Sequence, residues 1–401
     1  MLSQPVILSA VRTPIGSFQG SLEEIPATEL GSMVIGEAVR RAHVTPESVD
    51  EVFMGNVFTA GLGQAPARQA AIGAGLPTSV GATTVNKVCG SSLKAVIMAA
   101  QTIGCGDSKI AIAAGMENMS RVPYVLESAR KGYRLGHAQL VDSLIKDGLW
   151  DVYNNWHMGN AGELCARLFG LTREETDDFA LESYSRARRA IAEGAFRSEL
   201  IPVRSKASNK QSIIIVEDEE PNRVDLEKLR SLRSAFESEG VLTAGNSSKC
   251  SDGAAAVVLA STQEASRRGL RPMARILGYA EAGISPEHFP LAPVEAIHKV
   301  LKLTGFSINQ IDLFEINEAF SSVSLCINRE LGLDRSKVNV HGGAVALGHP
   351  IGATGARILT TLLYALKQRG GRLGLASLCI GGGEAIAIVV ESLEHDHSDS
   401  V

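Results

Sequence analysis

One order of strand-like and helix-like segments occurs twice along the 401-residue chain, and it constrains the fold more than any other feature. In the first half, apolar strand-like runs alternate with helix-like runs between residues 5 and 120. The matching segments are residues 38–56, 83–88 and 106–117 in the first half and residues 300–317, 336–341 and 370–382 in the second. Such alternation is typical of layered α/β units with buried central strands, and its repetition indicates an internal duplication.

The repeat predicts an α/β protein made of two duplicated layered halves, with an insertion between them. Residues 121–247 are more polar and include a helical segment, "TREETDDFALESYSRARRAIAEG", and the acidic segment "VEDEEPNRVD". Residues 251–261 resume the apolar character of a buried strand and are expected to rejoin the sheet of the first half. The predicted domain limits are 1–120 with 248–272 for the N-terminal half, 121–247 for an inserted loop domain, 273–395 for the C-terminal half and 396–401 for a disordered tail.

Charge and hydropathy argue against several classes of protein. The chain has 39 Lys and Arg residues against 44 Asp and Glu residues, a formal net charge of −5, which argues against a nucleic-acid-binding protein. Its apolar runs are short and interrupted by Gly or charge, so we expect no transmembrane helix and no membrane partner. The start, "MLSQPVILSAVRTPIG", has neither a signal-peptide nor a presequence pattern. We therefore expect a cytoplasmic protein, with a processed mitochondrial form as the alternative.

The cysteines are scattered in a way that argues against a zinc site or a disulfide framework. Clustered Cys-x-x-Cys pairs are absent from the sequence, so we expect no metal site and free thiols in a reducing compartment. Most free cysteines behave as small buried hydrophobic residues. The six cysteines are Cys89, Cys105, Cys165, Cys250, Cys326 and Cys379.

Cys89 stands at the junction of a strand-like and a helix-like segment, in "VNKVCGSSLKAV". The apolar residues that follow it, Leu93, Val96 and Ile97, have helical spacing. Free N–H groups in the first turn of that helix would stabilise a thiolate and lower the pKa of Cys89. From position alone, a reactive thiol and a buried structural thiol both remain open.

Three further polar residues end strand-like segments of the second half. His349 lies in the glycine-rich "NVHGGAVALGHPIGATGAR", which lets backbone approach a ligand but lacks the Gly-x-Gly-x-x-Gly dinucleotide pattern. Cys379 enters a triple-glycine turn in "SLCIGGGEA", where N–H groups can form an oxyanion hole. Asn317, in "EINEAF", is either a turn residue or an amide that holds a water.

These blocks together resemble the signature blocks of the thiolase family. The resemblance is carried by "NKVCGSSLKA", "GMENMS", "HMG", "NEAF", "GGAVALGHPIGATGAR" and "CIGGGEA", in the family's order and spacing over about residues 5–392. The chain is most similar to the short-chain acetoacetyl-CoA thiolases (acetyl-CoA C-acetyltransferases), and "RTPIGSFQGSL", "GLWDVYNNWHMG" and "EHFPLAPVEA" resemble their mitochondrial-type branch.

The resemblance implies a fold and an activity. The implied thiolase fold has five layers, αβαβα, and the implied enzyme is an acyltransferase. It condenses two acetyl-CoA reversibly to acetoacetyl-CoA and CoA, with these thioesters and CoA as its partners. A homotetramer built as a dimer of dimers and a place in fatty acid or ketone body metabolism are also implied.

The resemblance assigns roles to the candidate residues. Cys89 is implied to be the nucleophile that is acylated in a ping-pong reaction. His349 takes the thiol proton and later polarises a thioester oxygen, and Cys379 removes the α-proton of the second acetyl-CoA. His349 and a water held by Asn317 form one implied oxyanion hole, and the backbone N–H groups of Cys89 and Gly381 form the other.

The same resemblance places coenzyme A against the inserted region. Leu149, His157 and Met158 are implied to surround the pantetheine and the acyl group. Ser248 is implied to bond to the pantetheine amide, and Phe320 to line the pocket.

Two departures from the family pattern concern the cofactor and the coenzyme loop. The family's "SGLNDG" block reads "SKCSDG" here, so Lys249 is an additional phosphate contact or a solvated side chain. In the mitochondrial branch a tyrosine of an "EDEEY" segment helps to hold potassium, and Pro221 stands at that position. Proline has no hydroxyl, which argues against potassium activation, and we expect no tightly bound cofactor.

Three alternatives compete with this interpretation. A degradative 3-ketoacyl-CoA thiolase of broader chain length would need a longer pocket. Decarboxylating or initiating condensing enzymes of the same fold have histidine or asparagine at the position of Cys379. A non-enzymatic acyl-CoA binder would not need the set of Cys89, Asn317, His349 and Cys379.

Overall fold

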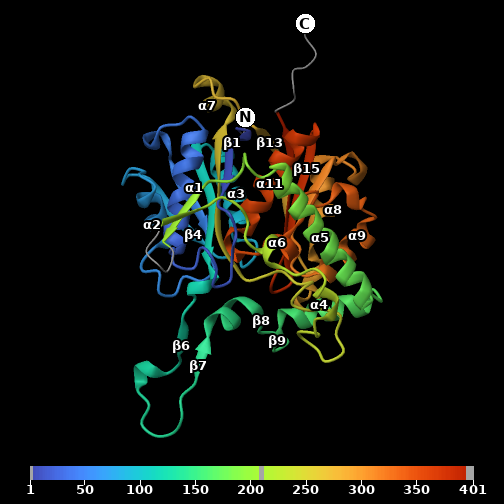
Figure 1. The fold of residues 1–401 in the computed structure, drawn as a ribbon. Helices are drawn as coiled ribbons and strands as arrows, with labels where there is room; N and C mark the ends of the chain where they lie inside the picture. The colour runs from blue at the N-terminus through green and yellow to red at the C-terminus, as the bar shows by residue number, and fades with distance from the viewer. Residues whose placement is uncertain (1–2, 207–211, 394–401) are drawn as a thin grey trace.

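Ten hydrogen-bonded strands form a mixed sheet at the centre of the molecule. We call the strands of the first half the first sheet and those of the second half the second sheet. The computed structural model describes residues 3–206 and 212–393, and its strand order is β14-β15-β16-β13-β1-β12-β5-β3-β4, with β2 beside β12. Figure 1 shows the first half, largely blue, beside the orange and red second half. The strands are β1 (Pro5–Arg12), β2 (Gly16–Ser17), β3 (Glu51–Gly55), β4 (Gly81–Val85), β5 (Ile110–Asn118), β12 (Ser251–Ser261), β13 (Ala274–Gly283), β14 (Leu313–Ile316), β15 (Leu373–Ile380) and β16 (Glu384–Ser392).

The strand order repeats, as the sequence predicted. The strand order is β1-β12-β5-β3-β4 in the first half and β13-β16-β15-β14 in the second. In each half, the strand that comes last along the chain lies beside the strand that comes first. Strand β12 is antiparallel to both β1 and β5, so residues 251–261 do rejoin the first sheet. The halves meet where β1 pairs with β13, Val6 opposite Arg275 and Ile7 opposite Ala274.

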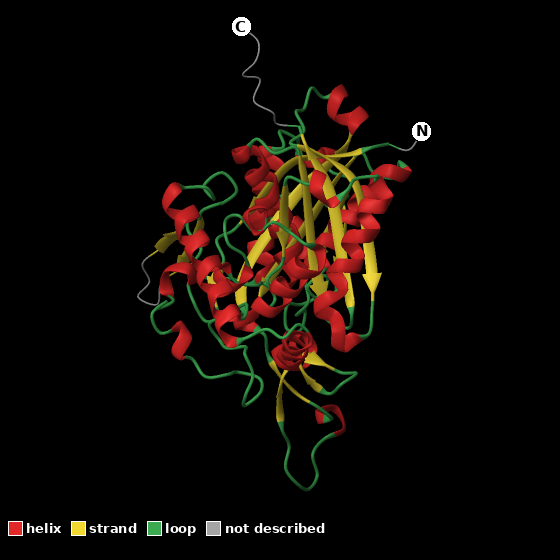
Figure 2. Cartoon of the chain, turned by 90° about the vertical axis from the view of Figure 1, so that its right-hand side faces the viewer, coloured by secondary structure: helices red, strands yellow, loops and turns green. Residues whose placement is uncertain are grey.

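Helices cover both sheets in five layers, αβαβα, which confirms the predicted fold class (Figures 1 and 2). Apolar residues of α1 and α2 pack on one outer face, those of α3 and α11 fill the space between the sheets, and those of α8 and α9 pack on the other outer face. These helices are α1 (Ala27–Arg41), α2 (Pro66–Gly73), α3 (Ser91–Cys105), α8 (Ala292–Thr304), α9 (Ser321–Leu331) and α11 (Thr354–Arg369).

The central helix α3 is unusually apolar because both of its sides face a sheet. Among the described residues, 88–105 form the one helical segment that is long and apolar enough to cross a membrane. Leu93, Val96, Ile97 and Ile103 of this segment are buried against both sheets and α11. The pattern is therefore that of a helix in the middle of a layered core.

One predicted strand of the second half is reduced to a single bridge. Residues 336–341 were expected to repeat the strand at 83–88, but Arg335–Lys337 form a 3₁₀ turn and Val338 alone bridges to Phe314. The cause is Asn339, which has a left-handed φ of 46°. Its side-chain amide accepts from Ile316 N at 2.8 Å and donates to Ile316 O at 2.8 Å, so it replaces the backbone pairing of a strand.

The insertion forms a protruding arm and a cap. The arm is the hairpin of β6 (Tyr124–Leu126) and β7 (Leu140–Asp142), which extends away from the body in Figures 1 and 2. The rest contains β8 (Trp150–Asp151), β9 (Trp156–His157), α4 (Met158–Leu168), α5 (Arg173–Glu193), β10 (Val203–Lys206), β11 (Ser212–Ile215) and α6 (Glu220–Arg223). The segment predicted to be helical is α5, which begins at a capping box between Thr172 and Glu175. The tail predicted at 396–401 lies outside the described residues.

A buried arginine fastens the insertion to the first strand. Arg12 is fully buried, and its guanidinium donates to Glu199 at 2.5 Å and to both carboxylate oxygens of Asp218 at 2.6 and 2.9 Å. The N–H of Ile15 also donates to Asp218, at 2.8 Å. Paired carboxylates of this kind compensate a buried guanidinium, and they fix the start of α6 next to the sheet.

Candidate active site

Cys89 lies in a tight turn between β4 and α3. Val88, directly before it, has a φ of 45°, which is strained for a β-branched residue and costs on the order of 1–3 kcal/mol. The hydroxyl of Ser91 donates to Val88 O at 2.6 Å and accepts from Lys87 N at 2.9 Å, and these bonds hold the turn. The strained turn presents the thiol ahead of the helix, so the predicted strand-to-helix position of Cys89 is correct.

The imidazole of His349 contacts the thiol of Cys89. Nε2 lies 3.3 Å from Sγ, although the two residues are 260 positions apart in the sequence. Nδ1 lies 2.6 Å from the hydroxyl of Thr354, and that hydroxyl donates its one hydrogen to Pro350 O at 3.0 Å. On this basis we assign the tautomer in which Thr354 accepts from Nδ1–H, which leaves Nε2 unprotonated and facing the thiol.

Burial disfavours the charged form of both partners. Burial raises the pKa of Cys89 to about 11, although backbone N–H groups of Gly381 and of Cys89 itself act in the opposite direction. Burial, followed by the positive charge of Arg357, lowers the pKa of His349 to about 3. The expectation that the helix terminus lowers the pKa of Cys89 is wrong, because desolvation of the sulfur outweighs its hydrogen bonds.

A second thiol lies next to the first. Cys379 is buried near the end of β15, and burial followed by the nearby Cys89 sulfur raises its pKa far above the ordinary value. The turn that follows includes Gly382 and Gly383, both with a φ of 92°, a conformation that favours glycine. It brings the backbone N–H of Gly381 to the sulfur of Cys89, which is the hydrogen bond expected for an oxyanion donor at that position.

Asn317 follows β14 and has an unpaired amide. Its backbone N–H donates to Ser377 O at 3.0 Å, and the residue is 1% exposed. Within residues 3–206 and 212–393, neither side-chain atom of the amide has a hydrogen-bond partner. A buried amide costs free energy unless it is paired, so this group is suited to hold a water or a substrate oxygen.

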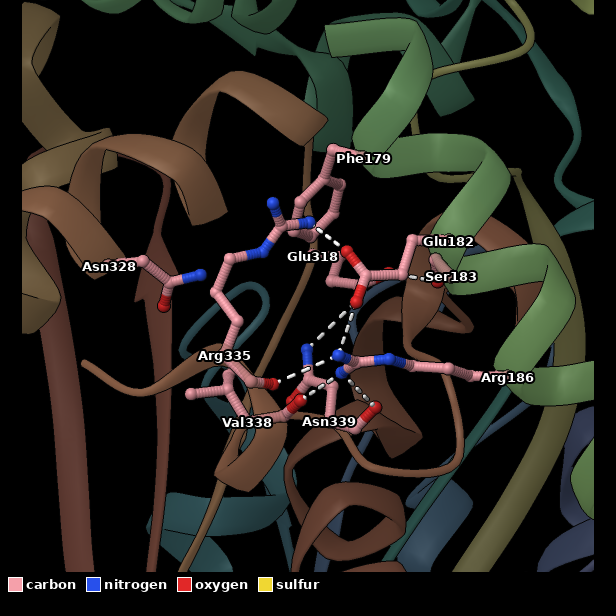
Figure 3. Close-up of a pocket in the computed structure, with 9 residues that line it drawn as sticks. All are labelled: Phe179, Glu182, Ser183, Arg186, Glu318, Asn328, Arg335, Val338 and Asn339. Atoms are coloured by element: carbon pink, nitrogen blue, oxygen red, sulfur yellow. Dashed lines mark hydrogen bonds and ion pairs between the residues drawn. The ribbon is translucent and has the colours of Figure 1, made fainter. Parts of the chain in front are cut away.

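Two buried carboxylates missed by the sequence interpretation hold the loops that carry these residues. Glu318 accepts from Ser183 Oγ at 2.7 Å, from Asn339 Nδ2 at 2.9 Å and from Val345 N at 3.1 Å. Figure 3 shows Glu318 between α5 and the segment around Asn339. The small cavity beside it is about 10 Å³, room for about one water, so it is no substrate site.

Glu117 makes the corresponding contacts from the first half. It accepts from Val57 N at 3.0 Å, Phe58 N at 3.2 Å and Gly352 N at 2.9 Å. Asn56 Nδ2 adds a fourth bond at 2.7 Å. Burial raises the pKa of Glu117 to about 7 even though these donors act in the opposite direction. The carboxylate thus joins two loops that are far apart in the sequence.

A cavity of about 620 Å³ opens next to His349. Its lining includes four of the five predicted coenzyme contacts, namely Leu149, His157, Ser248 and Phe320. Met158, the fifth, is outside this lining but lies beside Gly381. A methyl group on the Cα of Gly381 would be 3.4 Å from Met158 Cε.

An aromatic residue that the sequence interpretation missed also lines the cavity. The ring of Phe236 stacks on His157 at 4.9 Å and meets Phe320 edge-on at 5.6 Å, so three rings form one wall. Stacked rings of this kind give an apolar surface suited to an alkyl chain such as pantetheine. The signal for Phe236 is weak in sequence, because it lies in an irregular polar segment.

Known proteins match this chain along nearly its whole length. The N-terminal domain of thiolase matches residues 5–263 and the C-terminal domain of thiolase matches residues 270–392. The acetyl-CoA acetyltransferase of Pseudomonas aeruginosa is 50% identical over 386 residues, 96% of this chain and 98% of that protein. The mitochondrial acetyl-CoA acetyltransferase of Bos taurus is 49% identical over 393 residues, 98% of this chain and 92% of that protein.

A solved structure has the same fold. The crystal structure of the Acat5 thiolase from Ascaris suum in complex with coenzyme A superposes with a TM-score of 0.92 and 44% identity. The superposition covers 97% of this chain and 100% of that chain. With its duplicated sheets, its two neighbouring thiols and both family domains present, the chain belongs to the thiolase family.

Proposed function

We propose that this chain is an acetyl-CoA C-acetyltransferase that forms acetoacetyl-CoA and CoA from two acetyl-CoA, and that it catalyses the reverse thiolysis. The observation that carries the proposal is the 3.3 Å contact between unprotonated His349 Nε2 and the Cys89 thiol, with Cys379 beside it. Relatives about 50% identical to the chain bear the name acetyl-CoA acetyltransferase, which supports the short-chain substrate over the broader alternative.

The first half-reaction transfers an acetyl group to Cys89. His349 Nε2 takes the thiol proton while Sγ attacks the thioester carbonyl, and the bond from that carbon to the CoA sulfur breaks. The N–H groups of Cys89 and Gly381 stabilise the negative charge on the oxygen. Because Cys379 begins as a thiol, it protonates the departing CoA thiolate and becomes a thiolate itself.

The second half-reaction forms the carbon–carbon bond. The Cys379 thiolate removes an α-proton from the second acetyl-CoA, and the enolate attacks the acetyl group on Cys89. His349, now protonated at Nε2, and a water bound to the free amide of Asn317 donate to the enolate oxygen. Cys89 leaves as a thiolate and regains its proton from His349, so both thiols and the imidazole return to their starting states.

The stacked cavity wall is the proposed coenzyme site. Leu149, His157 and Phe320 supply apolar surface, Ser248 supplies a polar group for the pantetheine amide, and Met158 lies next to the acyl end at Gly381. No tightly bound cofactor forms part of this proposal. Across residues 3–206 and 212–393, no three His, Cys, Asp or Glu side chains are grouped as metal ligands would be.

Substrate length tests the proposed function. Initial rates of thiolysis would be measured with acetoacetyl-CoA, 2-methylacetoacetyl-CoA and 3-ketohexadecanoyl-CoA. We expect kcat/KM for acetoacetyl-CoA to exceed that for the long-chain substrate on the order of 100-fold, since the proposed acyl site is one for a short acyl group. Equal or faster cleavage of 3-ketohexadecanoyl-CoA would instead assign the degradative activity.

We also propose a homotetramer in the cytoplasm with a role in fatty acid or ketone body metabolism. Strand β4 is at the end of the sheet order, and the arm carries exposed apolar residues such as Tyr124, Leu135 and Leu140. Exposed apolar patches and open sheet edges favour association with further copies. Light scattering would test the tetramer, and fractionation of the cells would test the location. A monodisperse monomer, or a mitochondrial fraction, would contradict the corresponding part.

A further inference from the structure

Lys249 makes contacts that neither of its predicted roles explains. Its ammonium donates to Ala244 O at 2.5 Å and to Ser247 O at 2.8 Å, and it lies 5.8 Å from the centre of the Tyr184 ring. It therefore folds back on its own loop and is neither a solvated side chain nor a free phosphate contact. The loop that it ties together lines the proposed coenzyme cavity.

The backbone of the same residue is bonded to the catalytic loop. Lys249 O accepts from His349 N at 3.0 Å, while the neighbouring Ser248 N donates to Ala319 O at 3.1 Å. The side chain thus fixes one side of the loop and the main chain fixes the other. A displacement of this loop would move Ser248 in the cavity and His349 beside Cys89 together.

While the Lys249 ammonium is in place, the residues around it do not fit a potassium ion. Pro221, at the position where the mitochondrial branch has its potassium-binding tyrosine, is buried in α6 and its carbonyl accepts from Arg188 at 2.7 Å. The carbonyl oxygens of Ala244 and Ser247 already converge on an ammonium. A potassium ion beside the ammonium would be repelled by its positive charge.

The surroundings of Lys249 act on its charge in opposite directions. Burial lowers the pKa of Lys249 to about 8, while the carboxylate of Glu220 and the nearby Cys250 sulfur act in the opposite direction. Arg223 of α6 and His349 line the same cavity. Burial thus disfavours the charged form of Lys249, and the attraction of Glu220 and Cys250 offsets this only in part. Its contribution is the arrangement of the two carbonyls.

We propose that the Lys249 ammonium is an internal monovalent cation that positions the coenzyme loop, residues 244–248, and with it His349. It takes the place of an added potassium ion, so thiolysis by this chain does not depend on potassium. This inference rests on the proposed function for its kinetic effect, because only a coenzyme-binding loop would change KM.

The test replaces the ammonium and supplies a cation from solution. Wild type, Lys249→Ser and Lys228→Ser would be assayed for thiolysis of acetoacetyl-CoA in potassium chloride and in tetramethylammonium chloride of equal ionic strength. Lys228 is the matched control, because it is 79% exposed and pairs with Asp225 on the surface of the insertion. The melting temperature of each protein would be measured in both salts.

We expect wild type and Lys228→Ser to have the same KM for CoA in both salts. In tetramethylammonium chloride, Lys249→Ser should have a KM raised about tenfold, which corresponds to one lost charge-assisted hydrogen bond. Potassium, which fits between carbonyls, should restore most of this loss, whereas the bulky tetramethylammonium ion cannot.

Three results would overturn the proposal: stimulation of the wild type by potassium, an unchanged KM in Lys249→Ser, or equal restoration by both salts. If Lys249→Ser does not fold, the wild-type comparison alone decides the potassium question. If wild type shows no thiolysis, the proposed function fails separately. A melting temperature of Lys249→Ser that rises with potassium but not with tetramethylammonium would then still support the internal cation, and equal melting temperatures would contradict it.

Discussion

Glu117 and Glu318 hold opposite ends of the loop that carries His349. Gly352 N, after the histidine, donates to Glu117 at 2.9 Å, and Val345 N, before it, donates to Glu318 at 3.1 Å. The two carboxylates belong to different halves. Glu117 lies near the end of β5 in the first half, and Glu318 lies just after β14 in the second. Each of the duplicated halves therefore supplies one carboxylate that holds the loop of His349.

This relationship predicts that Glu117→Gln and Glu318→Gln each lower kcat about tenfold with a smaller change in KM. The amide of glutamine would turn an N–H toward a loop N–H, which leaves a buried donor unpaired at roughly 1–3 kcal/mol. Steady-state thiolysis with Glu264→Gln, a carboxylate of α7 (Thr262–Arg267) that pairs with Arg267 and Arg268, provides the control. Wild-type kcat in both variants would show that the loop does not need these bonds.

The contact between Thr354 and Nδ1 of His349 predicts a specific effect of Thr354. Thr354→Val keeps the shape of the side chain but removes the acceptor for Nδ1–H, so the proton can move to Nε2 and block removal of the Cys89 proton. We expect acetylation of the enzyme by acetyl-CoA to slow on the order of 10- to 100-fold, measured by rapid quench.

Two further variants make this prediction selective. Thr354→Ser retains the hydroxyl and should stay within a few-fold of wild type. Thr360→Val removes a hydroxyl of α11 that donates to Ala356 O at 2.8 Å, and should leave acetylation unchanged. Equal rates for Thr354→Val and wild type would refute the assigned tautomer.

The depressed pKa of His349 predicts acid sensitivity. In the unfolded chain an imidazole takes up a proton below its ordinary pKa of 6.5, whereas His349 in the folded protein stays neutral down to about pH 3. The stability that comes from this difference is complete above pH 6.5 and is lost as the pH falls toward 3.

Urea unfolding between pH 7 and pH 4.5 measures this contribution. The free energy of unfolding should fall less steeply with acid in His349→Gln than in wild type. His288→Gln changes a part-exposed histidine that contacts Ser285, and it should keep the wild-type slope. Parallel slopes for all three proteins would contradict the buried neutral imidazole.

The buried ion cluster predicts a large effect of Arg12 on stability. Arg12→Met leaves Glu199 and Asp218 buried without their partner, and removal of one member of such a pair costs about 3–5 kcal/mol. Arg40→Met breaks an exposed pair with Glu37 and should lower the free energy of unfolding far less than Arg12→Met. Denaturant melts compare the two variants, and similar losses would show that burial is not the deciding factor.

The sequence predicted those elements of the fold whose apolar residues form a long run or recur with helical spacing. Strand β12 and helix α5 were recognised because long apolar runs and helical spacing outweigh local detail. The strand at 336–341 was predicted wrongly because one side chain, Asn339, replaces the ladder, and no periodic pattern reports such a bond.

The site was predictable where the family resemblance implies a role for a residue, and not where a residue acts by holding a loop. Cys89 and His349 could be paired from their implied roles although they are 260 positions apart, whereas the sequence assigns no role to the bond between Glu117 and Gly352. The pKa of Cys89 was predicted in the wrong direction because burial of the turn depends on the second half of the chain. The Lys249 side chain bonds to backbone carbonyls of its own loop. This bond depends on the backbone conformation of the loop, which residue types alone do not define.

The division of work between the two thiols is the central claim, and mass spectrometry of the acetylated enzyme tests it most directly. Wild type, Cys89→Ala and Cys379→Ala would be incubated with acetyl-CoA, digested and mapped, while acetoacetyl-CoA is measured in the same samples. We expect one acetyl group on Cys89 in Cys379→Ala with almost no acetoacetyl-CoA, and neither product in Cys89→Ala. Acetylation that persists in Cys89→Ala, or condensation at the wild-type rate in Cys379→Ala, would contradict the account.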